Sequence, residues 1–163
     1  MIRCNKWSTV LVAAAAAIVV GTNTAAAGPL DRDQMAAYTD WALFDIDLDR
    51  FTEERNARRH GTEIDWSSDG CTGVTNKPLG RYDFTHACER HDFAYQNFRR
   101  QGRYNQPGLK QRFDNRFHDD MLSVCAGFDF VDRKTCQTSA DTYWEFVTGR
   151  FGPAEPPAGN AGN

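Results

Sequence analysis

The sequence lacks several features that would place it in a large class of proteins. Its longest apolar run, residues 10–20, is shorter than the roughly 20 residues that a helix needs to cross a bilayer. It has no G-x-S-x-G motif, which disfavours a serine hydrolase. It also has no C-x-x-C or H-x-x-x-H spacing, which disfavours a zinc site. Internal repeats and the alternating pattern of strands are missing as well, so the chain is expected to be helical.

The N-terminus has the three parts of a secretory signal peptide. Arg3 and Lys6 precede the apolar run, and the small residues Ala25–Ala27 form an A-x-A cleavage site. We therefore predict a signal peptide over residues 1–27 and a secreted, extracellular protein. The chain that remains after cleavage is long enough for one domain with a core of its own.

The mature chain is expected to be mildly acidic. The full sequence has a formal net charge of −3 at pH 7, and removal of Arg3 and Lys6 makes this charge more negative. Such a charge argues against a general nucleic-acid binder. A net negative charge also gives no reason to expect strong attraction to anionic surfaces. A local patch of Arg99, Arg100 and Arg103 could provide such attraction. We expect a monomer without a nucleic-acid partner.

Four of the five cysteines lie outside the predicted signal peptide: Cys71, Cys88, Cys125 and Cys136. In a secreted chain they favour two disulfides, for which three connectivities exist. Their order favours Cys71–Cys88 and Cys125–Cys136, because both bonds close short loops between predicted helix ends. Each bond would stabilise the fold by roughly 2–4 kcal/mol. With every mature cysteine paired, a cysteine nucleophile is disfavoured.

Hydrophobic periodicity predicts the helices. Amphipathic stretches at 33–44 and 47–59 make up an N-terminal helical segment, residues 28–60. A long ordered loop, rich in glycine and proline, follows at 61–84, and loops of this length are often functional. Three further helices are predicted at 86–101, 109–125 and 134–148, inside a catalytic domain spanning 61–151, with a disordered tail at 152–163. The fold class is a small, disulfide-stapled all-α domain in which the two long helices pack antiparallel.

The helix predicted at 86–101 contains His91 and Asp92 side by side. Consecutive helical residues point about 100° apart, so each of the two must serve a different neighbour. His91 falls on the inward stripe with Ala87, Ala94, Tyr95 and Phe98. A histidine on such a stripe is usually a core residue, but the second long helix places Asp114 at the edge of its own apolar stripe. A buried carboxylate is costly unless paired, so antiparallel packing would bring His91 and Asp114 together.

A carboxylate that holds one imidazole nitrogen fixes the tautomer and leaves the other nitrogen free to take a proton. The pair of His91 and Asp114 could therefore activate a water molecule. Asp92 would face the glycine-rich loop and meet Asp69. Two carboxylates and a loop carbonyl such as that of Gly70 form a hard oxygen site suited to Ca²⁺. A Cys71–Cys88 bond would hold this loop against the helix. The alternative to a calcium site is that Asp69 and Asp92 are solvated surface residues.

The segment Cys88-Glu89-Arg90-His91-Asp92-Phe93-Ala94-Tyr95 resembles the C-x-x-H-D-x-x-Y helix of secreted phospholipases A2. The upstream Asp69-Gly70-Cys71, the Pro78-x-Gly80 pair and the four mature cysteines resemble the small bacterial and fungal branch. The resemblance covers about residues 63–148. The Y-G-x-G-x-x-G calcium loop of the animal enzymes is absent here.

The resemblance implies a role for each site residue. His91 would be the general base that deprotonates water, and Asp114 would orient it. Asp69 and Asp92 would bind calcium through their carboxylates and Gly70 through its carbonyl. Calcium would bind the phosphate of a phospholipid at a membrane or micelle surface and polarise its sn-2 ester.

Two other functions remain open from the sequence. The scaffold could be a catalytically silent, calcium-dependent module that binds lipid or protein, because a fold alone does not fix an activity. The presence of His91, Asp92 and Asp114 disfavours it. A purely structural helical protein would leave these three inward-facing polar residues unexplained. Tyr95, one turn after His91, is expected to support packing or a hydrogen bond rather than catalysis.

Overall fold

The computed structural model describes residues 29–149, so the predicted signal peptide at 1–27 and tail at 152–163 lie outside the described residues. All regular structure within 29–149 is helical, which confirms the all-α class. The elements are α1 (Arg32–Asp40), a π-helical turn η1 (Trp41–Asp45), α2 (Leu48–Asn56), a 3-10 turn η2 (Pro78–Gly80), α3 (Thr85–Arg100), α4 (Leu109–Cys125) and α5 (Phe130–Val147). No helix in this part of the chain is long and apolar enough to cross a membrane.

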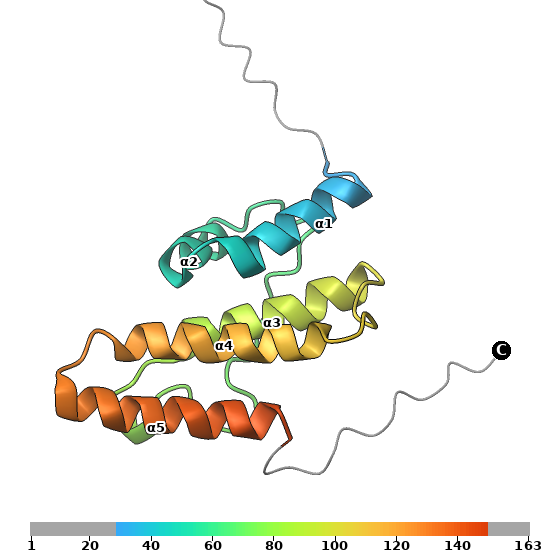
Figure 1. The fold of residues 1–163 in the computed structure, drawn as a ribbon. Helices are drawn as coiled ribbons and strands as arrows, with labels where there is room; N and C mark the ends of the chain where they lie inside the picture. Colours follow the sequence, from blue (N-terminus) through green and yellow to red (C-terminus); the bar gives the residue numbers. More distant parts are fainter. Residues whose placement is uncertain (1–28, 150–163) are drawn as a thin grey trace, which may run out of the picture.

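The helices form three layers (Figure 1). The long helices α3 and α4 lie side by side in the middle, with α1 and α2 on one side and α5 on the other. One core fills the space beneath α1 and α2 and includes Phe51, Trp66 and Phe93. A second core lies toward α5 and includes Phe84, Met121 and Ala140. The middle layer is therefore buried on two sides.

The antiparallel pairing of α3 and α4 is confirmed by the order of their contacts. Phe98, late in α3, touches Phe113, early in α4, with ring centroids 4.8 Å apart. His91 reaches Phe117 one turn further along α4, at 4.7 Å. Arg90 reaches Asp120. Because α3 and α4 are joined by a short connection, their antiparallel orientation follows from the chain direction.

The start of α5 and the end of α1 differ from the sequence prediction. Helix α5 begins at Phe130 rather than at 134, because the Asp129 side chain caps it by accepting from the backbone N–H groups of Val131 and Asp132. The helix predicted over 33–44 changes to the π-helical turn η1 after Asp40. The predictions at 86–101 and 109–125 each match their helix to within one residue. Gly102 follows α3 with φ +68°, as expected for a residue that ends a helix.

Helix α3 buries more than the one stripe predicted for it. Ala87, Ala94 and Phe98 are buried as expected, but Arg90 and Phe93 are also fully buried. The reason is the middle position of α3, which packs against α4 on one side and against α1 and α2 on another. A single amphipathic stripe is typical of a helix with one buried face, so periodicity alone could not reveal the second.

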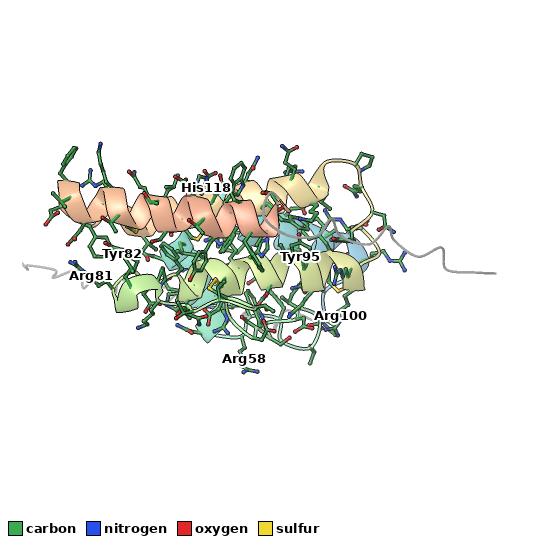
Figure 2. All side chains as sticks on the ribbon, turned by 90° about the horizontal axis from the view of Figure 1, so that it is seen from below. Arg58, Arg81, Tyr82, Tyr95, Arg100 and His118 are labelled. Carbon is green, nitrogen blue, oxygen red and sulfur yellow. A yellow bond between two sulfur atoms is a disulfide. The ribbon has the colours of Figure 1, made fainter. Side chains whose placement is uncertain are left out.

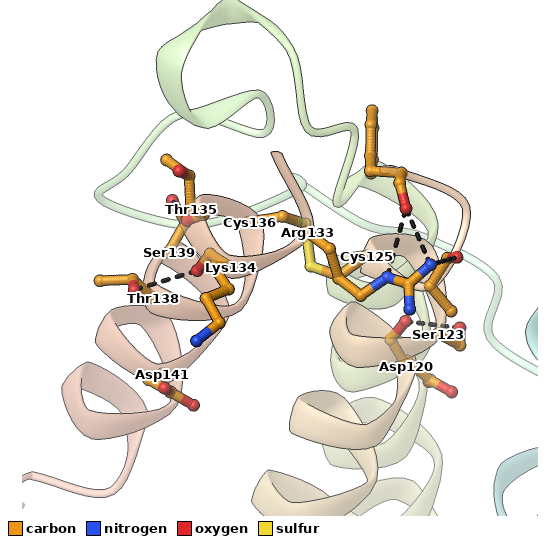
Figure 3. Close-up of a disulfide and its surroundings, with 12 residues drawn as sticks. Asp120, Ser123, Cys125, Arg133, Lys134, Thr135, Cys136, Thr138, Ser139 and Asp141 are labelled. Atoms are coloured by element: carbon orange, nitrogen blue, oxygen red, sulfur yellow. Dashed lines mark hydrogen bonds between the residues drawn. A yellow bond between two sulfur atoms is a disulfide. The ribbon is translucent and has the colours of Figure 1, made fainter. Parts of the chain in front are cut away.

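Both predicted disulfides are present. Cys71–Cys88 joins the long loop to α3, and Cys125–Cys136 joins the end of α4 to the first turns of α5. Figure 3 shows the second bond beside Arg133, whose guanidinium donates to the carbonyl oxygens of residues 126 and 128 in the α4–α5 connection. This connection is thus held by a covalent bond and by a charged donor.

A buried charge cluster joins the middle layer to the N-terminal helices. The Arg90 and Asp120 side chains are 1% and 4% exposed, with Nε and Oδ2 3.4 Å apart. Arg116 reaches the other Asp120 oxygen at 3.3 Å. Arg90 also donates to the carbonyl oxygens of Ile46 and Asp47 before α2. Burial raises the pKa of Asp120 to about 6, and burial lowers the pKa of Arg90 to about 10.

We predict that Asp120→Asn lowers the free energy of unfolding, because the cost of leaving Arg90 buried without a counter-charge, on the order of 3 kcal/mol, exceeds the relief from no longer burying an ionised carboxylate whose pKa is raised. Urea denaturation at pH 7.5, where the Asp120 carboxyl is ionised, measures this change. The control is Asp119→Asn, an exposed neighbour with the same change of charge. Equal stability of the two variants would contradict the role given to the buried cluster.

Candidate active site

A cleft of about 750 Å³ lies between the loop at residues 67–74, one face of α3 and the end of α5. Ser68, Asp69 and Gly70 line it from the loop, and His91 and Asp92 line it from α3. The residues predicted from the sequence to bind metal and to act as the base therefore share one cavity. Asp114 lies behind His91, in the interior.

His91 and Asp114 meet as the antiparallel packing predicts. The imidazole Nε2 lies 3.0 Å from Asp114 Oδ1. Phe117 stacks on the imidazole with ring centroids 4.7 Å apart, and Tyr95 packs edge-on at 4.9 Å. These two rings fix the plane of the imidazole. In the neutral tautomer that donates from Nε2, Nδ1 keeps a free lone pair.

The Asp114 carboxylate is only 3% exposed and accepts from three side chains. Besides His91, the Tyr95 hydroxyl donates to Oδ1 at 3.3 Å and the Lys110 ammonium donates to Oδ2 at 2.9 Å. Burial alone would raise the pKa of Asp114, but the hydrogen bonds from His91 and Lys110 outweigh it and hold the pKa below its usual value. Asp114 is therefore an anion at neutral pH.

Lys110 is the site residue that sequence reasoning missed. Its Nζ bridges Asp114 Oδ2 and the Val147 carbonyl at the end of α5, at 2.9 Å from each. The signal was present in the i, i+4 spacing of Lys110 and Asp114 on one helix. That spacing usually means a surface ion pair. Here it supplies the charge that a buried carboxylate requires.

Asp92 and Asp69 come together at the loop side of the cleft. The Asp92 carboxylate accepts from the Ser68 hydroxyl at 2.6 Å and from the Asp69 backbone N–H. Burial raises the pKa of Asp92, and the nearby charge of Asp69 raises it further. Asp69 itself is exposed and accepts from the Thr72 hydroxyl at 2.7 Å. Two carboxylates thus face one cavity without a basic side chain bonded to either within residues 29–149.

The donor atoms at this point fit a hard cation. Among the described residues no group of three or more His, Cys, Asp or Glu side chains could hold a metal. Asp69 and Asp92 supply two carboxylates, so further ligands would have to be carbonyl, water or substrate oxygens, which calcium accepts. Burial, and to a smaller extent the charge of Asp69, raises the pKa of Asp92, and a bound cation would favour the ionised carboxylate against both effects.

Gly70 has a conformation that only glycine adopts readily at this place. Its φ is +80°, and a Cβ added here would lie 2.8 Å from the Asn76 side chain. Asn76 in turn accepts from the Cys71 backbone N–H at 2.9 Å. The Gly70 carbonyl accepts from the Thr72 backbone N–H at 3.0 Å. The Cys71–Cys88 bond then fixes this turn to α3 one turn before Asp92.

The other histidines lie away from the cleft. His86 is half exposed and bonds Glu89, and His60 packs edge-on against Tyr38. His118 is only 22% exposed, because it bonds Asp141 at 2.8 Å and stacks on Trp144. His118 therefore links α4 to α5.

This small, disulfide-stapled helical domain, in which the cleft-lining His91 is paired with the buried Asp114, agrees with the resemblance to phospholipases A2. The family model described as prokaryotic phospholipase A2 matches residues 39–151. The chain belongs to this family, and the family consists of carboxylic ester hydrolases. The match begins within α1, so it includes α2, which lies outside the resemblance found in the sequence.

Two curated relatives are similar over most of this chain. One is the secretory phospholipase A2 of Beauveria bassiana, 36% identical over 116 residues, which are 71% of this chain and 58% of that protein. The other is the secretory phospholipase A2 of Arthroderma benhamiae, 36% identical over 115 residues, which are 69% of this chain and 76% of that protein. The chain thus matches about three-fifths of the length of the first relative and about three-quarters of the second.

We predict that Lys110→Met lowers the free energy of unfolding at pH 7 by about 1 kcal/mol, because Asp114 loses a charged donor at a partly exposed ammonium. The lowered pKa of Asp114 stabilises the fold above the pKa of the unfolded carboxyl. This stabilisation disappears as the pH falls through the folded value. The difference in free energy of unfolding between variant and wild type should therefore have its full size at pH 5–7 and shrink toward zero below about pH 4.

Urea denaturation at several pH values measures this difference. The control is Lys134→Met, which makes the same substitution at an exposed lysine. Lys134 lies over the Phe130 ring, at 5.0 Å from its centroid, and not beside a buried carboxylate. A pH-independent loss in the Lys110 variant would mean that its packing, and not its charge, stabilises the site.

Proposed function

We propose that this protein is a secreted, calcium-dependent phospholipase A2 that hydrolyses the sn-2 ester of glycerophospholipids. The observation that carries the proposal is the 3.0 Å contact between His91 Nε2 and a buried, ionised Asp114 at the base of the cleft. Membership of the prokaryotic phospholipase A2 family and the names of the two secretory relatives support it.

The proposed base is His91. A water molecule held at its free nitrogen Nδ1 would lose a proton to the ring as its oxygen attacks the ester carbonyl. The ring would then be a cation bonded to the Asp114 anion, which stabilises it. Lys110 and Tyr95 keep the carboxylate in place during this change. The imidazolium would return the proton to the departing alcohol oxygen, which leaves a fatty acid and a lysophospholipid.

The proposed metal site consists of the Asp69 and Asp92 carboxylates and the Gly70 carbonyl. When bound there, calcium would bind the substrate phosphate and withdraw electron density from the ester carbonyl. Asp92 directly follows His91 on α3, so the base and the metal ligands share one rigid element. The Cys71–Cys88 bond keeps the loop ligands in register with that element.

The far side of the cleft suits an acyl chain. Val74, Phe117, Phe146 and Val147 line it with apolar side chains. Phe146 and Val74 are also among the exposed large apolar residues. A chain leaving a micelle or membrane would enter along this side, and its ester would reach His91.

His91→Gln should lower turnover on a dispersed phospholipid by about 10²–10⁴-fold, since an amide cannot act as the base. Fatty-acid release from the purified protein gives the rate, and the free energy of unfolding reports on the fold. The matched control is His118→Gln, which removes a histidine that bonds Asp141 between α4 and α5, outside the cleft. If the His91 variant keeps normal turnover, the base is another group. If the wild type binds lipid with calcium and releases no fatty acid, the protein is the silent binding module.

Calcium at about 100 times its dissociation constant should stabilise the protein by about 2.7 kcal/mol, and excess chelator should abolish fatty-acid release while the helices remain. Asp92→Asn should remove this stabilisation. Without calcium the same variant should be at least as stable as the wild type, because the raised pKa of Asp92 means that its ionised form opposes folding at neutral pH.

Unfolding curves with and without calcium, followed by circular dichroism, make this measurement without any substrate. Asp119→Asn is the control for loss of one negative charge. An equal response of the wild type and the Asp92 variant to calcium would place the metal elsewhere.

A further inference from the structure

The three arginines at the end of α3 differ in their partners. Arg103 forms a two-pronged ion pair with Asp40, at 2.6 and 2.7 Å. Arg100 lies 3.9 Å from Asp65. Arg99 has no carboxylate partner among residues 29–149. The basic patch expected from the sequence is therefore largely neutralised, and one free positive charge remains.

Two tyrosine rings hold this free charge in place. The Arg99 guanidinium carbon lies 5.3 Å from the centroid of Tyr95 and 4.6 Å from that of Tyr104. Contacts of this kind favour a cation and restrict its motion. Tyr95 precedes Arg99 by one helical turn, so the side chain leans back toward His91, as helical side chains do. Arg100 points to another side of α3 from Tyr95 (Figure 2).

Apart from His91, Arg99 is the one basic side chain among residues 29–149 that lines the cleft. The polar residues Gln96 from α3 and Ser67 from the loop line the same cleft and bond each other at 3.0 Å. The apolar lining of Val74, Phe146 and Val147 comes from the loop tip and from the end of α5. Among residues 29–149, the lining of the cleft thus combines one guanidinium and several polar side chains with a set of apolar side chains.

We propose that Arg99 determines head-group specificity by binding an anionic group, a carboxylate or phosphate, that the head group carries beyond the phosphodiester. This inference rests on the proposed function. The Asp69 and Asp92 side of the cleft would hold the phosphodiester, and Arg99 lies about two turns further along α3, roughly 10 Å by helix rise. The planar guanidinium has unused donors that match a carboxylate or a phosphate with two parallel hydrogen bonds. A choline head group places a cation at the same point and is repelled.

The test compares kcat/KM for short-chain phosphatidylserine and phosphatidylcholine, each diluted in excess neutral detergent so that the surface charge stays constant. Arg99→Gln should lower the serine-to-choline ratio by about tenfold, the size expected for loss of one charge-assisted contact. Arg99→Lys should restore part of it. Arg100→Gln, which removes the same charge one residue away and outside the cleft, should leave the ratio within about twofold of the wild type.

An equal fall in the ratio for the Arg99 and Arg100 variants would overturn the proposal in favour of long-range attraction, and an unchanged ratio in Arg99→Gln would also overturn it. Calorimetric binding of the same two lipids by His91→Gln, with and without the Arg99→Gln change, separates the two levels of inference. Serine-selective binding that depends on Arg99 supports the site even if no turnover is found. Failure of turnover alone overturns only the proposed function.

Discussion

The burial of two carboxylates of α4 is the constraint on which this structure depends. Asp114 and Asp120 both point into the domain, and neither can remain buried as an anion without a partner. Helix α3 supplies the partners from consecutive residues, Arg90 for Asp120 and His91 for Asp114. These two pairs set the register of α3 on α4. They also fasten that register to the turn before α2, because Arg90 donates to backbone carbonyls there.

The pKa of the carboxylate is shifted in opposite directions in the two pairs. This difference suits the Arg90–Asp120 pair to a structural role and the His91–Asp114 pair to proton transfer. Burial raises the pKa of Asp120 to about 6, and its Oδ2 has no well-aligned donor. Asp114 accepts from His91, Tyr95 and Lys110, and its pKa is lowered. A permanently charged arginine can only hold its carboxylate. A histidine beside a firmly ionised carboxylate can gain and lose a proton, which is what a hydrolytic site requires.

The helices, the disulfides and the His91–Asp114 contact could be predicted from the sequence, because each depends on features close together in the chain. The long helices follow from periodicity and from end signals such as Gly102, and the disulfides follow from cysteine order. The His91–Asp114 contact follows from one short connection between two helices. The burial of Arg90 could not be predicted in this way, because an arginine is assigned to the surface unless its partners are known. Lys110 was missed for the same reason, since its acceptors come from α4 and from the far end of α5.

One face of α3 carries several of the residues that make up the candidate site. Cys88, Asp92, Tyr95 and Arg99 recur at spacings of four, three and four, so they lie on one face over about 16 Å. In that order the face provides the bond to the loop, the proposed metal ligand, a donor to Asp114 and a free cation. His91 lies 60° to the side of this face, toward α4 and Asp114. A single rigid helix therefore fixes the distances between the proposed base His91, the proposed metal ligand Asp92 and the proposed head-group site at Arg99. The loop, which has no regular structure beyond η2, is held at the cavity by the Cys71–Cys88 bond and by the left-handed turn at Gly70.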